Sequence, residues 1–153
     1  MNGNQSRKFG FEGQLTPFQT IWHIDANETD VFQSRLMLEK HGLCRNFGAF
    51  NSGRAGIFHL SQAQTLPDLI LLELYLPGKG GIDFLERLQE LPEEISSKTK
   101  VIVLTSWLNY RPLLIKQAFA FPQVMACLEK PLKTDVLLDT VLQVPETTTA
   151  IHF

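Results

Sequence analysis

Two short runs of purely aliphatic residues in the middle of the chain constrain the fold more than any other feature. Residues 69–72 and 101–104 consist of Leu, Ile and Val alone. A strand without alternating polar residues is buried on both of its faces, which is typical of parallel sheets covered by helices. These runs therefore predict the central strands of a parallel sheet.

Segments of strand-like composition alternate with segments that repeat apolar residues at helical spacing. Phe32 and Leu36, for example, lie four residues apart, and Gly42 follows as a stop signal. The expected strands are residues 20–24, 45–50, 68–73, 100–105 and 124–128, and the expected helices are residues 30–42, 52–64, 81–91, 109–120 and 133–144. This strict alternation predicts a doubly wound α/β domain with five parallel strands and helices on both faces of the sheet.

The length of 153 residues is that of one domain with one hydrophobic core. Residues 20–144 carry the alternating pattern and are predicted to form this domain. Residues 1–19 are rich in Gly, Asn and Gln, and they predict an N-terminal extension that is partly ordered at best. Residues 145–153 have no apolar period and predict a flexible C-terminal tail.

Charge and cysteine content exclude several classes of function. The formal net charge of -2 provides no basic field, so neither nucleic acid nor a membrane surface is expected as a direct partner. Cys44 and Cys127 match no metal spacing, and two thiols in a chain of this size indicate a reducing compartment. The N-terminus has no apolar signal segment and no run reaches membrane-spanning length, so we expect a cytoplasmic protein.

Polar residues with reactive side chains occur where the predicted strands end. Asp25 follows the first strand, Glu73 ends the third, Thr105 ends the fourth, and Lys130 comes just after the fifth. The carboxyl ends of the strands in a doubly wound sheet lie at one edge, and functional groups collect there. We therefore expect a functional site at this edge.

Four segments carry a resemblance to a known family: "HIDANETD", "PDLILLELYLPGKGG", "VIVLTS" and "LEKPL". Together, over residues 21–144, they resemble the receiver domain of response regulators in two-component signalling. The resemblance implies a flavodoxin-like strand order, 2-1-3-4-5. It also implies a phosphorelay role in which an acidic pair holds Mg²⁺ and an aspartate accepts a phosphoryl group from a histidine kinase.

The family's site positions fall on identifiable residues of this chain. The phospho-acceptor position is Glu73, and the acidic pocket is Asp25 with Ala26. The resemblance assigns phosphoryl binding and switching to the positions after the fourth strand and around the end of the fifth, which are Thr105, Ser106, Cys127 and Lys130. Pro131 completes a Lys-Pro loop of the cis type.

Four of these positions depart from the family's pattern. The acceptor is Glu73 instead of Asp, the second acid of the pair is Ala26, the usual aromatic switch residue is Cys127, and Gly80-Gly81 replaces Asp-Gly. Glutamate is longer than aspartate by one C–C bond, about 1.5 Å. Because a carboxylate is also lost at position 26, Mg²⁺ binding and phosphoryl transfer should be severely weakened.

No cofactor is therefore expected, although Asp25, Glu73 and the Tyr75 backbone could form a weak Mg²⁺ site. The sequence predicts a stand-alone, atypical response regulator, a pseudo-receiver that acts as a signalling protein-interaction module and not as an enzyme. The expected partner surface consists of the fourth helix, the fifth strand and the fifth helix, within residues 109–120, 124–128 and 133–142. Its expected partners are a histidine kinase, an output protein or a second copy.

Three alternative functions remain open at this stage. Glu73 could mimic a phosphorylated aspartate and hold the protein constitutively active, or it could still be phosphorylated within a phosphorelay. A small enzyme using Asp25 and Glu73 as an acid–base pair is less favoured, because the chain has no nucleophile–base pair and no GxGxxG or Walker loop.

Structural roles compete with the functional ones at several positions. Asp25 could be only a helix cap, Thr105 only the end of a strand, and Lys130 only a solvated loop residue. His23 and Cys127 are expected to be packed core residues. Tyr75 and Trp107 could equally cap the site or pack locally.

Overall fold

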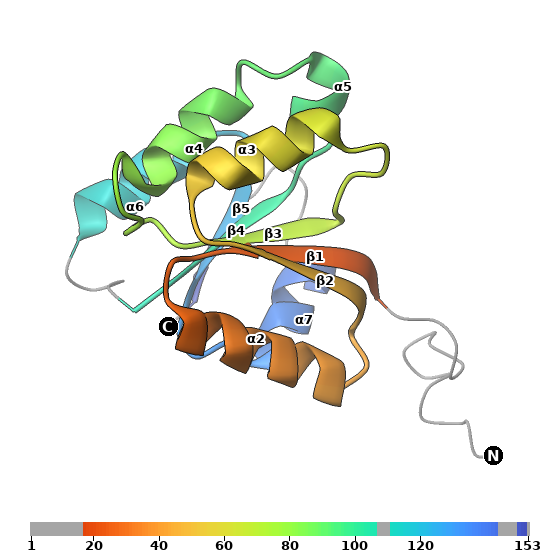
Figure 1. The fold of residues 1–153 in the computed structure, drawn as a ribbon. Helices are drawn as coiled ribbons and strands as arrows, with labels where there is room; N and C mark the ends of the chain where they lie inside the picture. Colours follow the sequence, from red (N-terminus) through yellow and green to blue (C-terminus); the bar gives the residue numbers. More distant parts are fainter. Residues whose placement is uncertain (1–16, 107–110, 144–149, 153) are drawn as a thin grey trace.

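The computed structural model describes residues 17–106, 111–143 and 150–152. Strands and helices alternate along the chain (Figure 1), as the sequence predicts. The strands are β1 (Phe18–Ile24), β2 (Cys44–Phe50), β3 (Leu69–Leu72), β4 (Val101–Thr105), β5 (Val124–Glu129) and β6 (Ala150–His152). The helices are α2 (Glu28–Lys40), α3 (Gly53–Gln62), α4 (Gly80–Leu88), α5 (Glu93–Ser96), α6 (Pro112–Phe119) and α7 (Thr134–Gln143).

All strands of the described sheet are parallel, in the order β2-β1-β3-β4-β5-β6. The first five strands confirm the predicted flavodoxin-like order 2-1-3-4-5. The order reverses between β1 and β3, which is the switch point where such sheets place their sites.

Regular secondary structure extends beyond the predicted domain at both ends. Ala150–His152 forms β6 on the edge of β5, so this part of the predicted flexible tail is ordered. An edge strand exposes unpaired backbone groups, and a short segment can pair with them without an apolar period of its own. At the other end, β1 already begins at Phe18, whose ring is buried in the core.

Helices cover both faces of the sheet (Figure 1): α3, α4 and α6 lie on one face, and α2 and α7 lie on the other. Each face has its own apolar core. The core under α3, α4 and α6 includes Ile24, Leu72 and Phe84, and the core under α2 and α7 includes Ile21, Leu38 and Leu137. β3 and β4 are buried throughout, as their uninterrupted aliphatic runs predict.

Side-chain caps define where the first two helices start. The Asn27 side chain accepts a hydrogen bond from the Asp30 backbone N–H at the start of α2, and Ser52 caps α3 in the same way. The short helix α5 was not predicted, because its four residues are too few to show a period. No helix in the described part of the chain combines the length and apolarity needed to cross a membrane.

Candidate functional site

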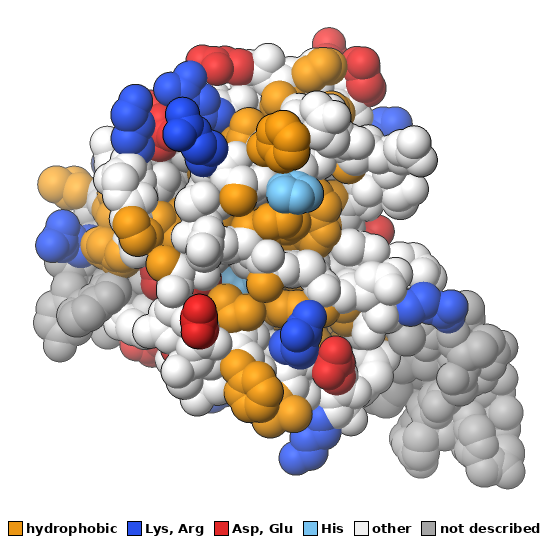
Figure 2. All heavy atoms as spheres, in the orientation of Figure 1, with side chains coloured by type: hydrophobic (Ala, Val, Ile, Leu, Met, Phe, Trp, Pro, Cys, Tyr) orange, Lys and Arg blue, Asp and Glu red, His pale blue; other side chains and the backbone are white. Residues whose placement is uncertain are grey.

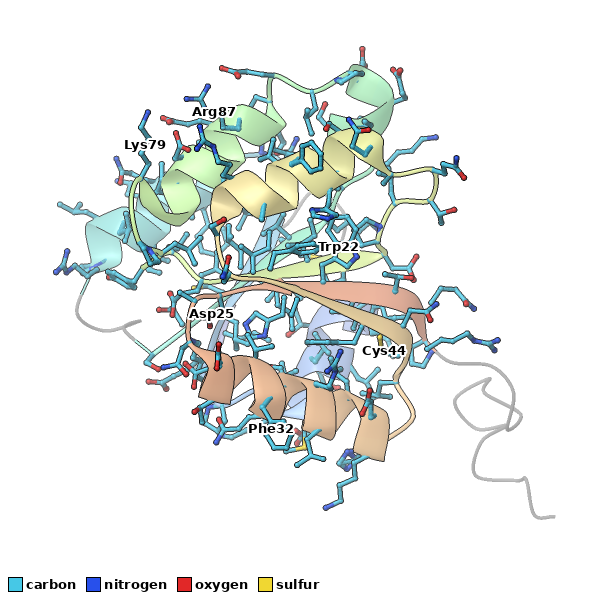
Figure 3. All side chains as sticks on the ribbon, in the orientation of Figure 1. Trp22, Asp25, Phe32, Cys44, Lys79 and Arg87 are labelled. Atoms are coloured by element: carbon cyan, nitrogen blue, oxygen red, sulfur yellow. The ribbon has the colours of Figure 1, made fainter. Side chains whose placement is uncertain are left out.

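Backbone hydrogen bonds fix the residues that follow the central strands. The Glu73 N–H donates to the Ile24 carbonyl (3.0 Å), the Asp25 N–H to that of Phe50 (2.9 Å), and the Lys130 N–H to that of Thr105 (3.0 Å). These bonds continue the parallel ladders one step beyond the regular strands. Side chains from β1, β3 and β5 therefore meet at one edge of the sheet, where Figure 3 places Asp25.

The Lys130 ammonium lies among three carboxylates. Its Nζ atom is 2.7 Å from Asp25 Oδ2, 2.7 Å from Asp30 Oδ2 and 2.9 Å from Glu73 Oε1. The side chains of Lys130, Asp25 and Glu73 are only 9%, 3% and 5% exposed, whereas Asp30 is 24% exposed. Lys130 therefore forms ion pairs with both Asp25 and Glu73, and the alternative of a solvated loop lysine is excluded.

Asp30 is the residue of this cluster that sequence reasoning missed. It lies in the first turn of α2, after the N-cap residue Asn27. Acidic residues are common in the first helical turn because they complement the helix dipole. The sequence therefore contains no signal that separates a site carboxylate at position 30 from an ordinary helix-start acid.

Each inner carboxylate uses both of its oxygen atoms. Asp25 Oδ1 accepts from the Asn27 backbone N–H at 2.9 Å, and Glu73 Oε2 accepts from the Tyr75 backbone N–H at 3.1 Å. The other oxygen of each acid faces Lys130. Asp25 thus fixes the loop that precedes α2. The N-cap residue of this helix is Asn27, not Asp25.

The electrostatics of the cluster favour its charged form. Burial alone would raise the pKa of the Asp25 carboxyl, but the close contacts with His23 and Lys130 and the hydrogen bond from the Asn27 backbone outweigh it and lower that pKa. Burial alone would lower the pKa of Lys130, but its bonds to Asp25, Asp30 and Glu73 raise that pKa far above its usual value. Lys130 is therefore a permanent cation in this site.

His23 and Cys127 are packed core residues, as predicted. His23 is fully buried, with Nε2 at 3.4 Å from Asp25 Oδ2 and its ring edge-on to Phe47. Cys127 is fully buried in the core under α3, α4 and α6. Burial, with a smaller contribution from Glu73, raises the pKa of Cys127 to about 12, so it is a neutral thiol.

The remaining predicted residues lie around this cluster. Thr105 is fully buried at the end of β4, while Ser106 next to it is exposed. The Lys130–Pro131 peptide bond is cis. Tyr75 is half-buried and its ring faces the Arg111 guanidinium at 5.4 Å, which indicates local packing. Trp107 lies outside the described residues.

The comparison with known protein families agrees with this geometry. The response regulator receiver domain family matches residues 21–142. The chain belongs to the response-regulator receiver family. No match was found among curated proteins.

Solved receivers share the fold of this receiver. A response regulator receiver protein from Dyadobacter fermentans is 30% identical, with a TM-score of 0.70 over 80% of this chain and 94% of that chain. A two-component response regulator from Cytophaga hutchinsonii is 21% identical, with a TM-score of 0.72 over 81% and 94% of the two chains.

A third solved relative was crystallised with a metal. It is the receiver domain of a sensor histidine kinase from Pseudomonas aeruginosa PAO1, with a magnesium ion coordinated in its active-site cleft. It is 20% identical to this receiver, with a TM-score of 0.67 over 82% of this chain and 96% of that chain. Whether this receiver can bind such an ion depends on the oxygen ligands that its own residues offer.

The donor set of this receiver does not fit a resident Mg²⁺. Mg²⁺ requires oxygen ligands in near-ideal octahedral geometry, but the oxygens of Asp25 and Glu73 already contact Lys130 and backbone N–H groups. Ala26 supplies no side-chain oxygen. Within the described residues, no three acidic, His or Cys side chains are arranged to share a metal. The ammonium of Lys130 is the cation that these carboxylates bind.

Proposed function

We propose that this receiver is a signalling protein-interaction module whose state does not depend on Mg²⁺ or on phosphorylation of Glu73. One observation carries the proposal: the Lys130 ammonium lies within 2.7–2.9 Å of Asp25, Asp30 and Glu73. The carboxylate at the acceptor position thus already forms an ion pair with a cation of the protein itself.

Phosphoryl transfer to Glu73 would have to disrupt this arrangement. Attack on phosphorus by a Glu73 oxygen would compete with the contact to Lys130 at one oxygen and with the hydrogen bond from the Tyr75 N–H at the other. Charge on a transferring phosphoryl group is usually stabilised by metal ions and cationic side chains. Here Ala26 removes a metal ligand, and Lys130 is shared among three acids.

We expect Glu73 to remain unmodified when the protein is incubated with Mg²⁺ and acetyl phosphate, because Ala26 removes a metal ligand and both Glu73 oxygens already have partners. Intact-mass spectrometry measures the result. The matched control is a phosphorylatable receiver treated in parallel to verify the donor. A phosphate mass gain that peptide mapping places on Glu73 would contradict the proposal.

Partner binding is proposed to use the outer surfaces of α6 and α7. Leu113 on α6 is 76% exposed and Leu142 on α7 is 73% exposed, and exposed apolar side chains commonly mark an interface. The edge of β5 is paired with β6, so a partner would not reach it directly. The proposed surface therefore differs from the sequence-based expectation, in which β5 itself was part of the contact.

Changing Leu113 to Glu should weaken association at least about tenfold, since a buried charge at an interface loses its hydration. Self-association is measured by sedimentation velocity, and binding to the phosphotransfer domain of a histidine kinase from the same genome by calorimetry. The control is Phe58→Glu on α3, where an equally apolar side chain is 59% exposed. Equal losses for the two variants, or no binding of either kind by the unchanged protein, would argue against this surface.

A second candidate function is a constitutively active receiver in which Glu73 mimics a phosphorylated aspartate. The contact of 2.9 Å between Glu73 Oε1 and Lys130 Nζ favours it, because the longer side chain reaches the phosphoryl-binding lysine. Changing Glu73 to Gln separates the two candidates. Binding that survives within about twofold supports the phosphorylation-independent module, whereas binding that is abolished, with Leu113→Glu without effect, supports the mimic.

A further inference from the structure

A cavity of about 560 Å³ lies between the starts of α3 and α4, and none of its lining residues belongs to the Lys130 cluster. Its walls come from the first turn of α3, from the glycine-containing loop before α4, and from α4 itself. Cationic residues dominate its charge: Arg54, Lys79 and Arg87 line it together with a single acid, Asp83. Figure 2 shows blue side chains gathered around a red one over α4.

These cations are poorly neutralised by the protein. Within the described residues, Arg54 and Lys79 form no ion pair. Arg87 contacts Asp83 and Glu90 only at 3.7 Å and 3.5 Å, both on the exposed surface, where such pairs contribute little. A local positive charge thus persists in a chain whose formal net charge is -2.

The positions of two of these cations oppose the stability of their helices. Lys79 is the N-cap residue of α4, which has no side-chain cap and a single acid, Asp83, in its first turn, and Arg54 lies in the first turn of α3, which contains no acid. A helix N-terminus carries a partial positive charge, so cations there are unfavourable unless an anion compensates them. Both helix ends and both cations border the same cavity.

Glycines allow this close approach of the two helix starts. A Cβ atom on Gly53 would lie 3.1 Å from Phe84 Cβ, so a larger residue would push α3 away from α4. Gly80 has φ +80°, which a side chain would strain, and it turns the chain into α4 beside Lys79. Figure 3 shows Lys79 and Arg87 projecting outward from α4, on the side away from the sheet.

We propose that this cavity binds a small ligand with two adjacent phosphate groups, such as pyrophosphate or the diphosphate end of a nucleotide. Three cations against one acid give the cavity a net positive charge that suits a diphosphate, and guanidinium groups bind phosphate oxygens in pairs. The cavity has the size of a ligand pocket. Ile57 supplies an apolar wall against which the rest of a nucleotide can pack.

The test measures binding of pyrophosphate and of ADP to the full chain by calorimetry in metal-free buffer. We expect saturable binding of pyrophosphate, and a loss of at least about tenfold in the variant Arg54→Gln/Lys79→Gln. The control Lys40→Gln/Lys98→Gln removes the same charge from exposed positions elsewhere and should bind like the unchanged protein. ADP binding more tightly than pyrophosphate would identify a nucleotide as the ligand, and equal binding would identify the diphosphate alone.

Amide NMR shifts locate the ligand independently of affinity. The signals of Gly53, Gly78 and Gly80 should move on titration, while that of Lys130 should not. No saturable binding of either ligand at millimolar concentration would overturn the proposal. So would equal affinity of the cavity variant and the control, with circular dichroism showing both folded. None of these outcomes depends on whether Glu73 can be phosphorylated.

Discussion

Changing Lys130 to Met should lower the free energy of unfolding by about 3–5 kcal/mol at pH 7, as measured by urea denaturation. The variant retains a side chain of similar length but leaves Asp25, Asp30 and Glu73 without their common cation. Removing one partner of a buried ion pair is strongly destabilising because the remaining charges stay desolvated. No larger stability effect is expected from any other single change in the site.

The control is Lys133→Met, which removes the same charge from an exposed position three residues further along the chain. It should change the free energy of unfolding by less than about 0.5 kcal/mol. Similar small effects for both variants would mean that the Lys130 contacts contribute nothing, and the proposed function would lose its physical basis.

The pH dependence of stability provides a second measure of the same cluster. The pKa of Asp25 is lowered in the folded protein, so its contribution to stability is present above the ordinary Asp pKa of 3.8 and is lost as pH falls through the folded pKa. The pKa of Lys130 is raised, so its contribution to stability is complete below the ordinary Lys pKa of 10.5 and is lost only as pH rises through the folded pKa. In Lys130→Met the acids repel one another only while ionised, so its deficit should shrink at acidic pH.

The combined change Ala26→Asp with Glu73→Asp should convert the protein into one that binds Mg²⁺ at least about tenfold more tightly, as measured by calorimetry. The first change adds a carboxylate next to Asp25, and the second shortens the acceptor so that it withdraws from Lys130. Each single change should have a smaller effect, because each restores only one part of an octahedral ligand set.

Adding Asp25→Asn to the double variant provides the control and should abolish the gained affinity. If the double variant binds no Mg²⁺, then Lys130 and Asp30 still occupy the site, and the explanation based on Ala26 and Glu73 is insufficient. The triple variant with Asp30→Asn would then show whether releasing Lys130 restores binding.

The strand-end residues of the site could be predicted because sheet geometry determines where they meet. Parallel neighbours place their carboxyl ends at one edge, so Asp25, Glu73 and Lys130 are neighbours once the strands are identified. Asp30 could not be predicted this way. Its position depends on the entry angle of α2, which is set by the Asn27 cap and by packing on the sheet, and neither leaves a distinct sequence pattern.

The fold, like the site, could be predicted only in part from the sequence pattern. The aliphatic runs of β3 and β4 predicted the sheet, because strands that are apolar on both faces are typical of parallel sheets covered by helices. β6 and α5 were missed, because a segment of three or four residues is too short to show a period. β6 depends on backbone groups offered by β5, which a sequence pattern does not record, whereas the backbone hydrogen bonds of α5 are local to residues 92–98.

A receiver with Lys130 as its built-in counter-ion has consequences for how a cell could control it. Neither magnesium depletion nor the supply of phosphoryl donors would alter a cluster whose cation is covalently part of the chain. If binding is likewise independent of covalent modification, the remaining variables are how much of the protein is present and how many copies of its partner compete for it. Synthesis and degradation would then determine the strength of the signal, because the concentration of the protein would set how much of its partner is bound.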